Sequence, residues 1–299
     1  MPPKNTKGEA FAGLSVALTT PLRQGEVDYD ALRAQVDFQI AAGTNCLCPV
    51  GTTGESPTLS HDEHERVIAA VVEFAAGRAK VMPGTGSNST REALRLTGWA
   101  AKAGADAALV VAPYYNKPTQ EGLYRHYKTI ADAVDLPLVI YNIPSRTSVN
   151  ILPATIARLS SIRNIVAIKE GAGSLGQVSE IIQACGDRIT VLAGDDALTL
   201  PMMAVGAQGV ITVTANIAPA DMAALVDAFA AGKLDQAKAL HYKLYPLFTA
   251  LFYETNPIPV KEALGMMGKI QPELRLPLCP MSVENREKLA GALKDYGLI

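Results

Sequence analysis

The chain has 299 residues, of which 48% are hydrophobic and 19% charged, and its formal net charge is −2. This balance provides no basic surface for nucleic acid or an anionic membrane. No run approaches the roughly 18 apolar residues of a membrane span, and the opening MPPKNTKGEA lacks the apolar segment of a secretory signal. We therefore expect a cytoplasmic protein. The low charged fraction indicates extra buried surface, such as subunit contacts.

Short apolar runs recur along the chain, and a polar or Gly/Pro-rich segment follows each of them. The eight runs cover residues 13–19, 45–50, 79–84, 106–112, 137–142, 165–170, 189–194 and 209–215. Several are almost continuously apolar, which is typical of parallel strands covered on both faces. Their spacing leaves room for one helix between successive strands.

The intervening segments have helical patterns. Residues 60–77 place apolar side chains on one stripe and end at a glycine, and residues 221–231 do the same before Gly232. Alternating strands and helices predict an α/β fold, a (β/α)8 TIM barrel over residues 1–232. A doubly wound open sheet is the alternative, but the Gly-rich nucleotide turn that often follows its first strand is missing here.

Residues 233–299 have no strand pattern and are predicted to form a C-terminal helical extension of the barrel. One helix should bend at Pro246. Asn256 is expected to cap a second helix that has Pro257 at its first position. A last helix should begin after Ser282.

The cysteines and histidines have no metal-binding pattern. Cys46 and Cys48 should share one strand face, and no CxxC pair or zinc spacing occurs among the four cysteines. They are expected to be small buried thiols in a reducing compartment. The run HDEH, residues 61–64, could contribute a metal pair, but no third ligand is indicated. The alternative is a helix start, because Ser60 and Glu63 form a capping box.

Lys169 follows the apolar residues IVAI near the end of the sixth run. Reactive groups of a TIM barrel lie at the carboxyl ends of its strands. An ammonium group in a low-dielectric site loses hydration, which favours the neutral amine that attacks a carbonyl carbon to form a Schiff base. The alternative is a lysine that pairs with the adjacent Glu170 at the barrel rim.

Other polar side chains follow neighbouring strands at the same end of the predicted barrel. Tyr141 lies near the end of the fifth run, and the turn GTTGE at 51–55 follows the second. Their hydroxyl groups could relay the protons that Schiff-base chemistry requires. Arg146 could bind a substrate carboxylate in a fork, or be a solvated loop residue. Asp195 and Asp196 follow the seventh run and would repel phosphate, which favours small unphosphorylated carboxylates as substrates.

Seven motifs in order make the chain resemble the class I pyruvate-dependent lyase and aldolase family. They are GTTGE at 51–55, PYYNKP at 113–118, YNIPSRT at 141–147, IKE at 168–170, GDD at 194–196, GVITVTAN at 209–216 and ETNPIPVK at 254–261. The resemblance implies a TIM-barrel enzyme that condenses pyruvate with L-aspartate 4-semialdehyde, the first committed step of lysine biosynthesis through diaminopimelate. It also implies a homotetramer and chemistry without a metal or organic cofactor.

The same resemblance implies roles for single residues. Lys169 would form the Schiff base, and Thr52, Tyr115 and Tyr141 would relay protons, with Tyr115 reaching a neighbouring subunit. Arg146 would receive the carboxylate of aspartate semialdehyde. The residues implied to bind pyruvate or line its pocket are Thr53, Gly194 and Ile211. Those that match the types of a lysine effector site are Ser56, His61, His64, Gly86, Asn88, Glu92 and Tyr114.

Three questions stay open at this point. Pro57 departs from the small residue usual beside the effector site and lacks an N–H donor, so the strength of inhibition by lysine is open. Another lyase or aldolase of the family, acting on N-acetylneuraminate or a 2-keto-3-deoxy sugar acid, is an alternative. The second threonine of GTTGE and Arg146 favour the synthase reaction. A non-catalytic barrel that senses a keto acid or lysine is the other alternative.

Overall fold

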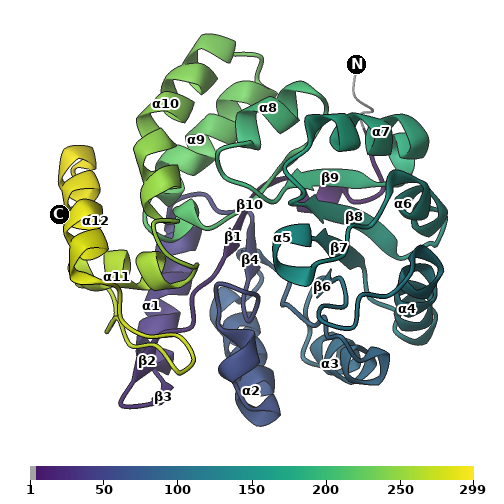
Figure 1. Cartoon of the computed structure of the whole chain (residues 1–299), viewed down its shortest axis with the longest axis horizontal. Helices are drawn as coiled ribbons and strands as arrows, with labels where there is room; N and C mark the ends of the chain where they lie inside the picture. The colour runs from purple at the N-terminus through teal and green to yellow at the C-terminus, as the bar shows by residue number, and fades with distance from the viewer. Residues whose placement is uncertain (1–4) are drawn as a thin grey trace.

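Eight parallel strands form one sheet in the computed structural model, which describes residues 5–299 (Figure 1). Residues 1–4 lie outside the described residues. They belong to the predicted barrel domain and to the opening segment that lacks a secretory signal pattern. The strands are β1 Gly13–Ala17, β4 Cys46–Cys48, β5 Lys80–Val81, β6 Ala108–Val111, β7 Leu138–Asn142, β8 Ile165–Glu170, β9 Thr190–Ala193 and β10 Gly209–Thr212. Each lies within one of the eight predicted runs.

The sheet closes on itself, which decides between the barrel and the open sheet. The strand order is β5-β4-β1-β10-β9-β8-β7-β6. A parallel bridge between Gly84 and Leu109 joins the two ends, and the Leu109 N–H donates to the Pro83 carbonyl oxygen at 2.9 Å. The (β/α)8 barrel is therefore confirmed, and the doubly wound alternative is wrong.

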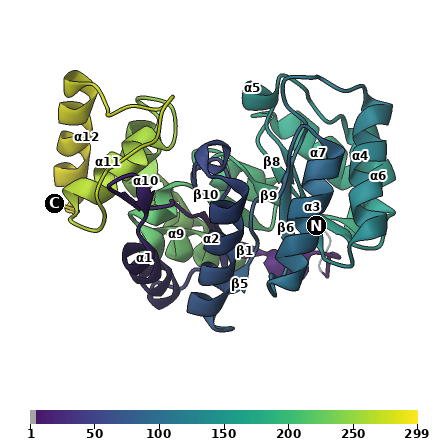
Figure 2. The same ribbon diagram turned by 90° about the horizontal axis from the view of Figure 1, so that it is seen from below.

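Helices surround the barrel on its outside, except the short α5, which lies at the end of the barrel, as Figures 1 and 2 show. They are α1 Tyr29–Ala41, α2 His61–Ala75, α3 Thr90–Lys102, α4 Gln120–Ala133, α5 Pro144–Thr147, α6 Pro153–Ser160, α7 Leu175–Cys185, α8 Thr199–Ala204 and α9 Pro219–Ala230. The helix predicted from residue 60 is α2, and its capping box is present, because Ser60 and Glu63 each bond the other's backbone N–H. The sequence did not predict the hairpin of β2 Leu22–Arg23 and β3 Glu26–Val27.

Three further helices follow α9: α10 Leu234–Ala250, α11 Ile258–Met266 and α12 Val283–Tyr296. Pro246 lies inside α10, and the Ser282 side chain caps α12. The prediction for Asn256 and Pro257 is wrong. Pro257 is the residue before α11, and no side chain caps this helix. The Asn256 amide is engaged elsewhere, because it donates to the Thr53 hydroxyl at 3.0 Å.

Two hydrophobic layers result from the alternation of side chains along the strands. The inner layer fills the barrel and includes Cys46, Cys48, Tyr141 and Ile211, and the outer layer joins the sheet to its helices. Cys46 and Cys48 therefore share one strand face, as predicted. All four cysteines are free among the described residues, and Cys46, Cys48 and Cys185 are buried as predicted. The prediction of a buried thiol is wrong for Cys279, which is exposed in the segment before α12. No helix of residues 5–299 is long and apolar enough to cross a membrane.

Candidate active site

Lys169 lies inside the barrel at the end of β8. It is 5% exposed, and its register partners on the neighbouring strands are Tyr141 and Leu192. Its Nζ lies 4.4 Å from the centroid of the Tyr141 ring. The inner layer includes Ala167, Tyr141 and Leu192, so the side chain two residues after Ala167 faces the same interior.

Glu170 does not pair with Lys169, contrary to the alternative reading of the sequence. Adjacent residues of a strand face opposite sides, and Glu170 points outward. Its carboxylate accepts hydrogen bonds from the Asn142 amide at 3.0 Å, the Gln177 amide at 3.1 Å and the Ala172 N–H at 2.6 Å. Burial raises the pKa of this carboxyl, opposed by those donors. No ion pair to Lys169 exists among the described residues.

A cavity of about 500 Å³ opens at this end of the barrel. Its walls come from the segment after β4, the starts of α2 and α3, the ends of β6 and β7, α5, and the segments before α11 and α12. The candidate residues that line it are Thr52, Tyr141, Arg146, Ser56, His61, His64, Gly86, Glu92 and Tyr114. Most of the expected catalytic and effector groups therefore border one continuous space.

The other candidate residues lie outside the lining of this cavity. Lys169 is one of them, and Lys169, Thr53 and Ile211 are all buried. Gly194 follows β9, where its N–H donates to the Glu170 carbonyl oxygen, and an added Cβ would lie 2.9 Å from that oxygen. The backbones therefore leave no room for a side chain at this position. Asn88 is half-buried and accepts a hydrogen bond from Asn116 through its carbonyl oxygen.

Tyr115 does not line the cavity of its own chain. Its side chain is 89% exposed, and its φ of +72° is a left-handed conformation that non-glycine residues seldom adopt. Within the described residues of one chain, the structure brings this hydroxyl to no other candidate catalytic group.

Arg146 lies on α5, above Tyr141. Its Nη2 donates to the Asn256 carbonyl oxygen at 3.0 Å, and the residue is exposed. The guanidinium keeps other N–H groups for a ligand, since arginine has five. Asn256 is a site residue that the sequence analysis missed. It lines the cavity, and its buried Oδ1 has no hydrogen-bond partner in the structure.

The opposite part of the cavity holds His61 and Glu92 in a polar cluster. Arg95 donates to Nδ1 of His61 at 3.0 Å, which leaves Nε2 as the donor to the Glu92 carboxylate at 2.8 Å. The hydroxyl of Ser87 also donates to this carboxylate. These hydrogen bonds, that of Ser87 first, lower the pKa of Glu92. No group of three metal-ligating side chains occurs among residues 5–299.

His64 and His126 are buried, and each is 5% exposed. Burial removes water from the charged ring and lowers the pKa of each from 6.5 to about 4. Nδ1 of His64 and Nε2 of His126 have no partner that could stabilise an added proton. Both side chains are therefore neutral structural groups at neutral pH.

The protein should lose stability as the pH falls from 6.5 to about 4. In this range the unfolded chain protonates both histidines and the folded chain neither, so the free energy of unfolding decreases. Each histidine can account for about 3 kcal/mol by pH 4. Urea unfolding of His126→Gln at pH 7 and pH 4.5 should show a weaker pH dependence than the unsubstituted protein. His61→Gln is the control, because that side chain is 47% exposed. An unchanged pH dependence in His126→Gln would contradict the assignment.

Residues 10–296 match the dihydrodipicolinate synthetase family. The chain belongs to this family. It is 59% identical over 290 residues to the 4-hydroxy-tetrahydrodipicolinate synthase of Syntrophobacter fumaroxidans, covering 97% of this chain and 100% of the relative. The resemblance stated from the motifs is thereby confirmed.

Solved structures of the family have the same architecture. The chloride-inhibited dihydrodipicolinate synthase of Acinetobacter baumannii, complexed with pyruvate, is 49% identical and superposes with a TM-score of 0.95, covering 97% of this chain and 100% of its own. The enzyme of Cyanidioschyzon merolae with lysine bound is 38% identical, also with a TM-score of 0.95, covering 97% and 99%.

Proposed function

We propose that the chain condenses pyruvate with L-aspartate 4-semialdehyde to 4-hydroxy-tetrahydrodipicolinate, the first committed step of lysine biosynthesis through diaminopimelate. The observation that carries this proposal is the buried Lys169 amine against Tyr141 at the end of β8. The synthase relatives, among them the enzyme complexed with pyruvate, support it.

In the proposed reaction the Lys169 amine attacks the C2 carbonyl of pyruvate, and loss of water leaves an imine. Loss of a C3 proton gives an enamine, and its C3 attacks the aldehyde carbon of aspartate semialdehyde, whose oxygen takes up a proton. The amino group of the second substrate then attacks C2, closes the ring and displaces Lys169. The imine is the electron sink, so this chemistry needs no metal or organic cofactor.

We propose Thr52, Tyr141 and Tyr115 as the proton relay. Tyr115 would act in a neighbouring subunit of a homotetramer, which its 89% exposure and left-handed backbone support. Thr53, Ile211 and Gly194 would hold and border pyruvate. We assign residues 1–232 to the barrel and 233–299 to its extension, since Gly232, with φ of +74°, separates α9 from α10. The free cysteines support a location in the cytoplasm, which is a reducing compartment.

A panel of substrates tests the reaction. Pyruvate with aspartate semialdehyde should be turned over with a higher kcat/KM than N-acetylneuraminate or a 2-keto-3-deoxy sugar acid. A higher kcat/KM on a sugar acid would reassign the enzyme within its family. If borohydride traps no pyruvate adduct at all, the sensor alternative would replace the enzyme.

We also propose L-lysine as an inhibitor that binds among His61, Glu92 and Tyr114. These residues border the same cavity as Tyr141, and the relative from Cyanidioschyzon merolae has lysine bound. The anionic Glu92 offers a partner for an ammonium group.

Millimolar lysine should inhibit the enzyme, and Glu92→Gln should raise the half-inhibiting concentration about tenfold, the effect of losing one charge-assisted hydrogen bond. Initial rates at increasing lysine concentration measure this. Glu121→Gln is a matched control, because that carboxylate lies exposed on α4 and binds Arg125 and Arg158. Activity that does not change at millimolar lysine would contradict the effector site.

A further inference from the structure

A buried ion pair joins α11 to the turn after β4. Nζ of Lys261 lies 2.5 Å from Oε1 of Glu55, and the two side chains are 0% and 2% exposed. Loss of hydration lowers the pKa of Lys261, opposed by the Glu55 charge. Burying two charges carries a large desolvation penalty that their attraction offsets only in good geometry. The proposed reaction uses neither group, so the pair calls for another explanation.

Glu55 closes the turn that carries Thr52 and Thr53. Its backbone is left-handed, with φ of +54° and ψ of +36°, a conformation unfavourable for a residue with a Cβ. Its N–H donates to the Thr52 carbonyl oxygen at 3.2 Å, and its own carbonyl oxygen accepts from the Thr58 N–H at 3.0 Å. The side chain is held by Lys261 and by the Arg275 N–H at 3.3 Å. Contacts from the C-terminal extension therefore maintain this turn.

The residues just before α11 reach the same turn at a second point. The Asn256 amide donates to the Thr53 hydroxyl, and the Asn256 carbonyl oxygen accepts from Arg146. Residues 256–261 thus contact the turn through Thr53 and Glu55 and hold Arg146 as well. One short segment of the extension therefore contacts both Thr53, proposed to bind pyruvate, and Arg146, proposed to bind aspartate semialdehyde.

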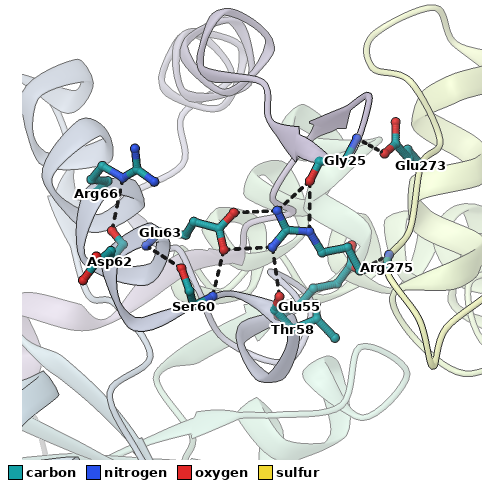
Figure 3. A network of polar contacts seen from close by, with 9 residues as sticks. All are labelled: Gly25, Glu55, Thr58, Ser60, Asp62, Glu63, Arg66, Glu273 and Arg275. Carbon is teal, nitrogen blue, oxygen red and sulfur yellow. Dashed lines mark hydrogen bonds and ion pairs between the residues drawn. The ribbon is translucent and has the colours of Figure 1, made fainter.

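Arg275 fastens the turn from its outer side (Figure 3). Its guanidinium donates to the Thr58 carbonyl oxygen at 2.9 Å, to the Gly25 carbonyl oxygen at 2.6 Å and to both carboxylate oxygens of Glu63. The hydrogen bonds from Arg275, together with those of Ser60, lower the pKa of Glu63 to about 2. Arg275 therefore links residues 55–63 both to the extension and to the hairpin of β2 and β3.

We propose that Lys261 and Glu55 are a positioning pair, which docks the turn of residues 51–58 on α11. The pair thereby places Thr52 at the cavity beside Tyr141 and the Thr53 hydroxyl against the Asn256 amide. This inference rests on the proposed function, because it gives the two threonines their roles. Neither Lys261 nor Glu55 touches a substrate in it. The C-terminal extension is thereby part of the catalytic apparatus rather than only a cover for the barrel.

The experiment compares Lys261→Met with the unsubstituted protein, using kcat per trapped site as the readout. Borohydride and pyruvate titrate the intact Lys169, so turnover divided by trapped Lys169 is independent of any unfolded fraction. We expect kcat per trapped site to fall about 10²-fold, the scale of a misplaced proton-transfer group. The KM for pyruvate should rise about tenfold through Thr53.

Arg286→Met is the matched control. Glu262 follows Lys261 on α11, and its carboxylate lies 2.7 Å from Nε of Arg286 on α12. This ion pair joins α11 to α12 and does not contact the turn. Its removal should leave kcat per trapped site and both KM values unchanged.

Lys261→Met leaves the Glu55 carboxylate buried without its cation, and this variant could fail to fold. A double variant is therefore tested as well. Lys261→Met with Glu55→Leu removes both charges and is expected to fold, since apolar groups commonly replace a buried ion pair without loss of stability. It should still have the lowered kcat per trapped site, because the turn loses its anchor. A folded double variant with unchanged kcat and KM overturns the inference. Absence of a pyruvate adduct in the unsubstituted protein would instead refute the proposed function.

Discussion

Replacing Lys169 with alanine should abolish the pyruvate-dependent adduct and lower kcat by about 10⁴-fold or more, the scale of removing a covalent nucleophile. Lys169 is the lysine that faces the barrel interior, with its Nζ 4.4 Å from the centroid of the Tyr141 ring. Among the described residues, the cavity beside Tyr141 is lined by no lysine that could replace it. Mass spectrometry after borohydride reduction measures the adduct, and a coupled assay measures turnover.

Two further variants make this result specific. Lys169→Met keeps most of the side-chain volume, so a loss of adduct there cannot come from a cavity in the core. Lys80→Met is the control, because Lys80 on β5 pairs with Asp106 and is 46% exposed. An adduct that persists in Lys169→Ala, at another lysine, would contradict the assignment of the nucleophile.

Replacing Arg146 with alanine should leave the pyruvate adduct intact and lower kcat/KM for aspartate semialdehyde about 10²-fold. The expected loss is that of a charge-assisted, forked contact to a carboxylate, about 3 kcal/mol. Lys169 and Tyr141 belong to strands and do not depend on α5, so the first half of the reaction should proceed. Steady-state kinetics with the second substrate varied, alongside trapping, separates the two halves.

Arg146→Lys should recover only part of this loss, because a lysine ammonium keeps the charge without the planar fork. Arg163→Ala serves as the control, since Arg163 is 80% exposed and pairs with Asp135 before β8, at the opposite end of the strand from Lys169. If Arg146→Ala used aspartate semialdehyde as well as the unsubstituted enzyme does, Arg146 would have no role in binding it.

The placement of Lys169 could be predicted because its causes are local. A run such as IVAIK is apolar enough to become a buried strand, and the period of two along a strand sets Lys169 and Glu170 on opposite faces. The same holds for α2, where Ser60 and Glu63 lie three residues apart and form the predicted capping box. Patterns within one element are visible before any tertiary contact is known.

The error at Asn256 has the opposite origin. Asparagine before proline is a common start of a helix, so local preference favoured a cap. In the structure the Asn256 amide instead meets Thr53, which is 203 residues away along the chain. Glu55 and Lys261 are 206 residues apart, and nothing near either one in sequence indicates the other. Hairpin strands of two residues, such as β2 and β3, are too short to show any period.

Local patterns in the amino-acid sequence were enough to predict the alternation of eight strands with helices and the end of the barrel that carries the chemistry. They also predicted the lysine, tyrosine and arginine at that end. These follow from hydrophobic period and from the rule that parallel strands end at one face. Three other features became known only from the folded chain: the sheet closes between Gly84 and Leu109, one cavity extends from Tyr141 to His61, and α11 binds the threonine turn through Lys261. Each of these features brings together segments that are far apart in the sequence. The free energy that stabilises them comes from burying side chains, and those side chains are buried only after the whole chain has packed.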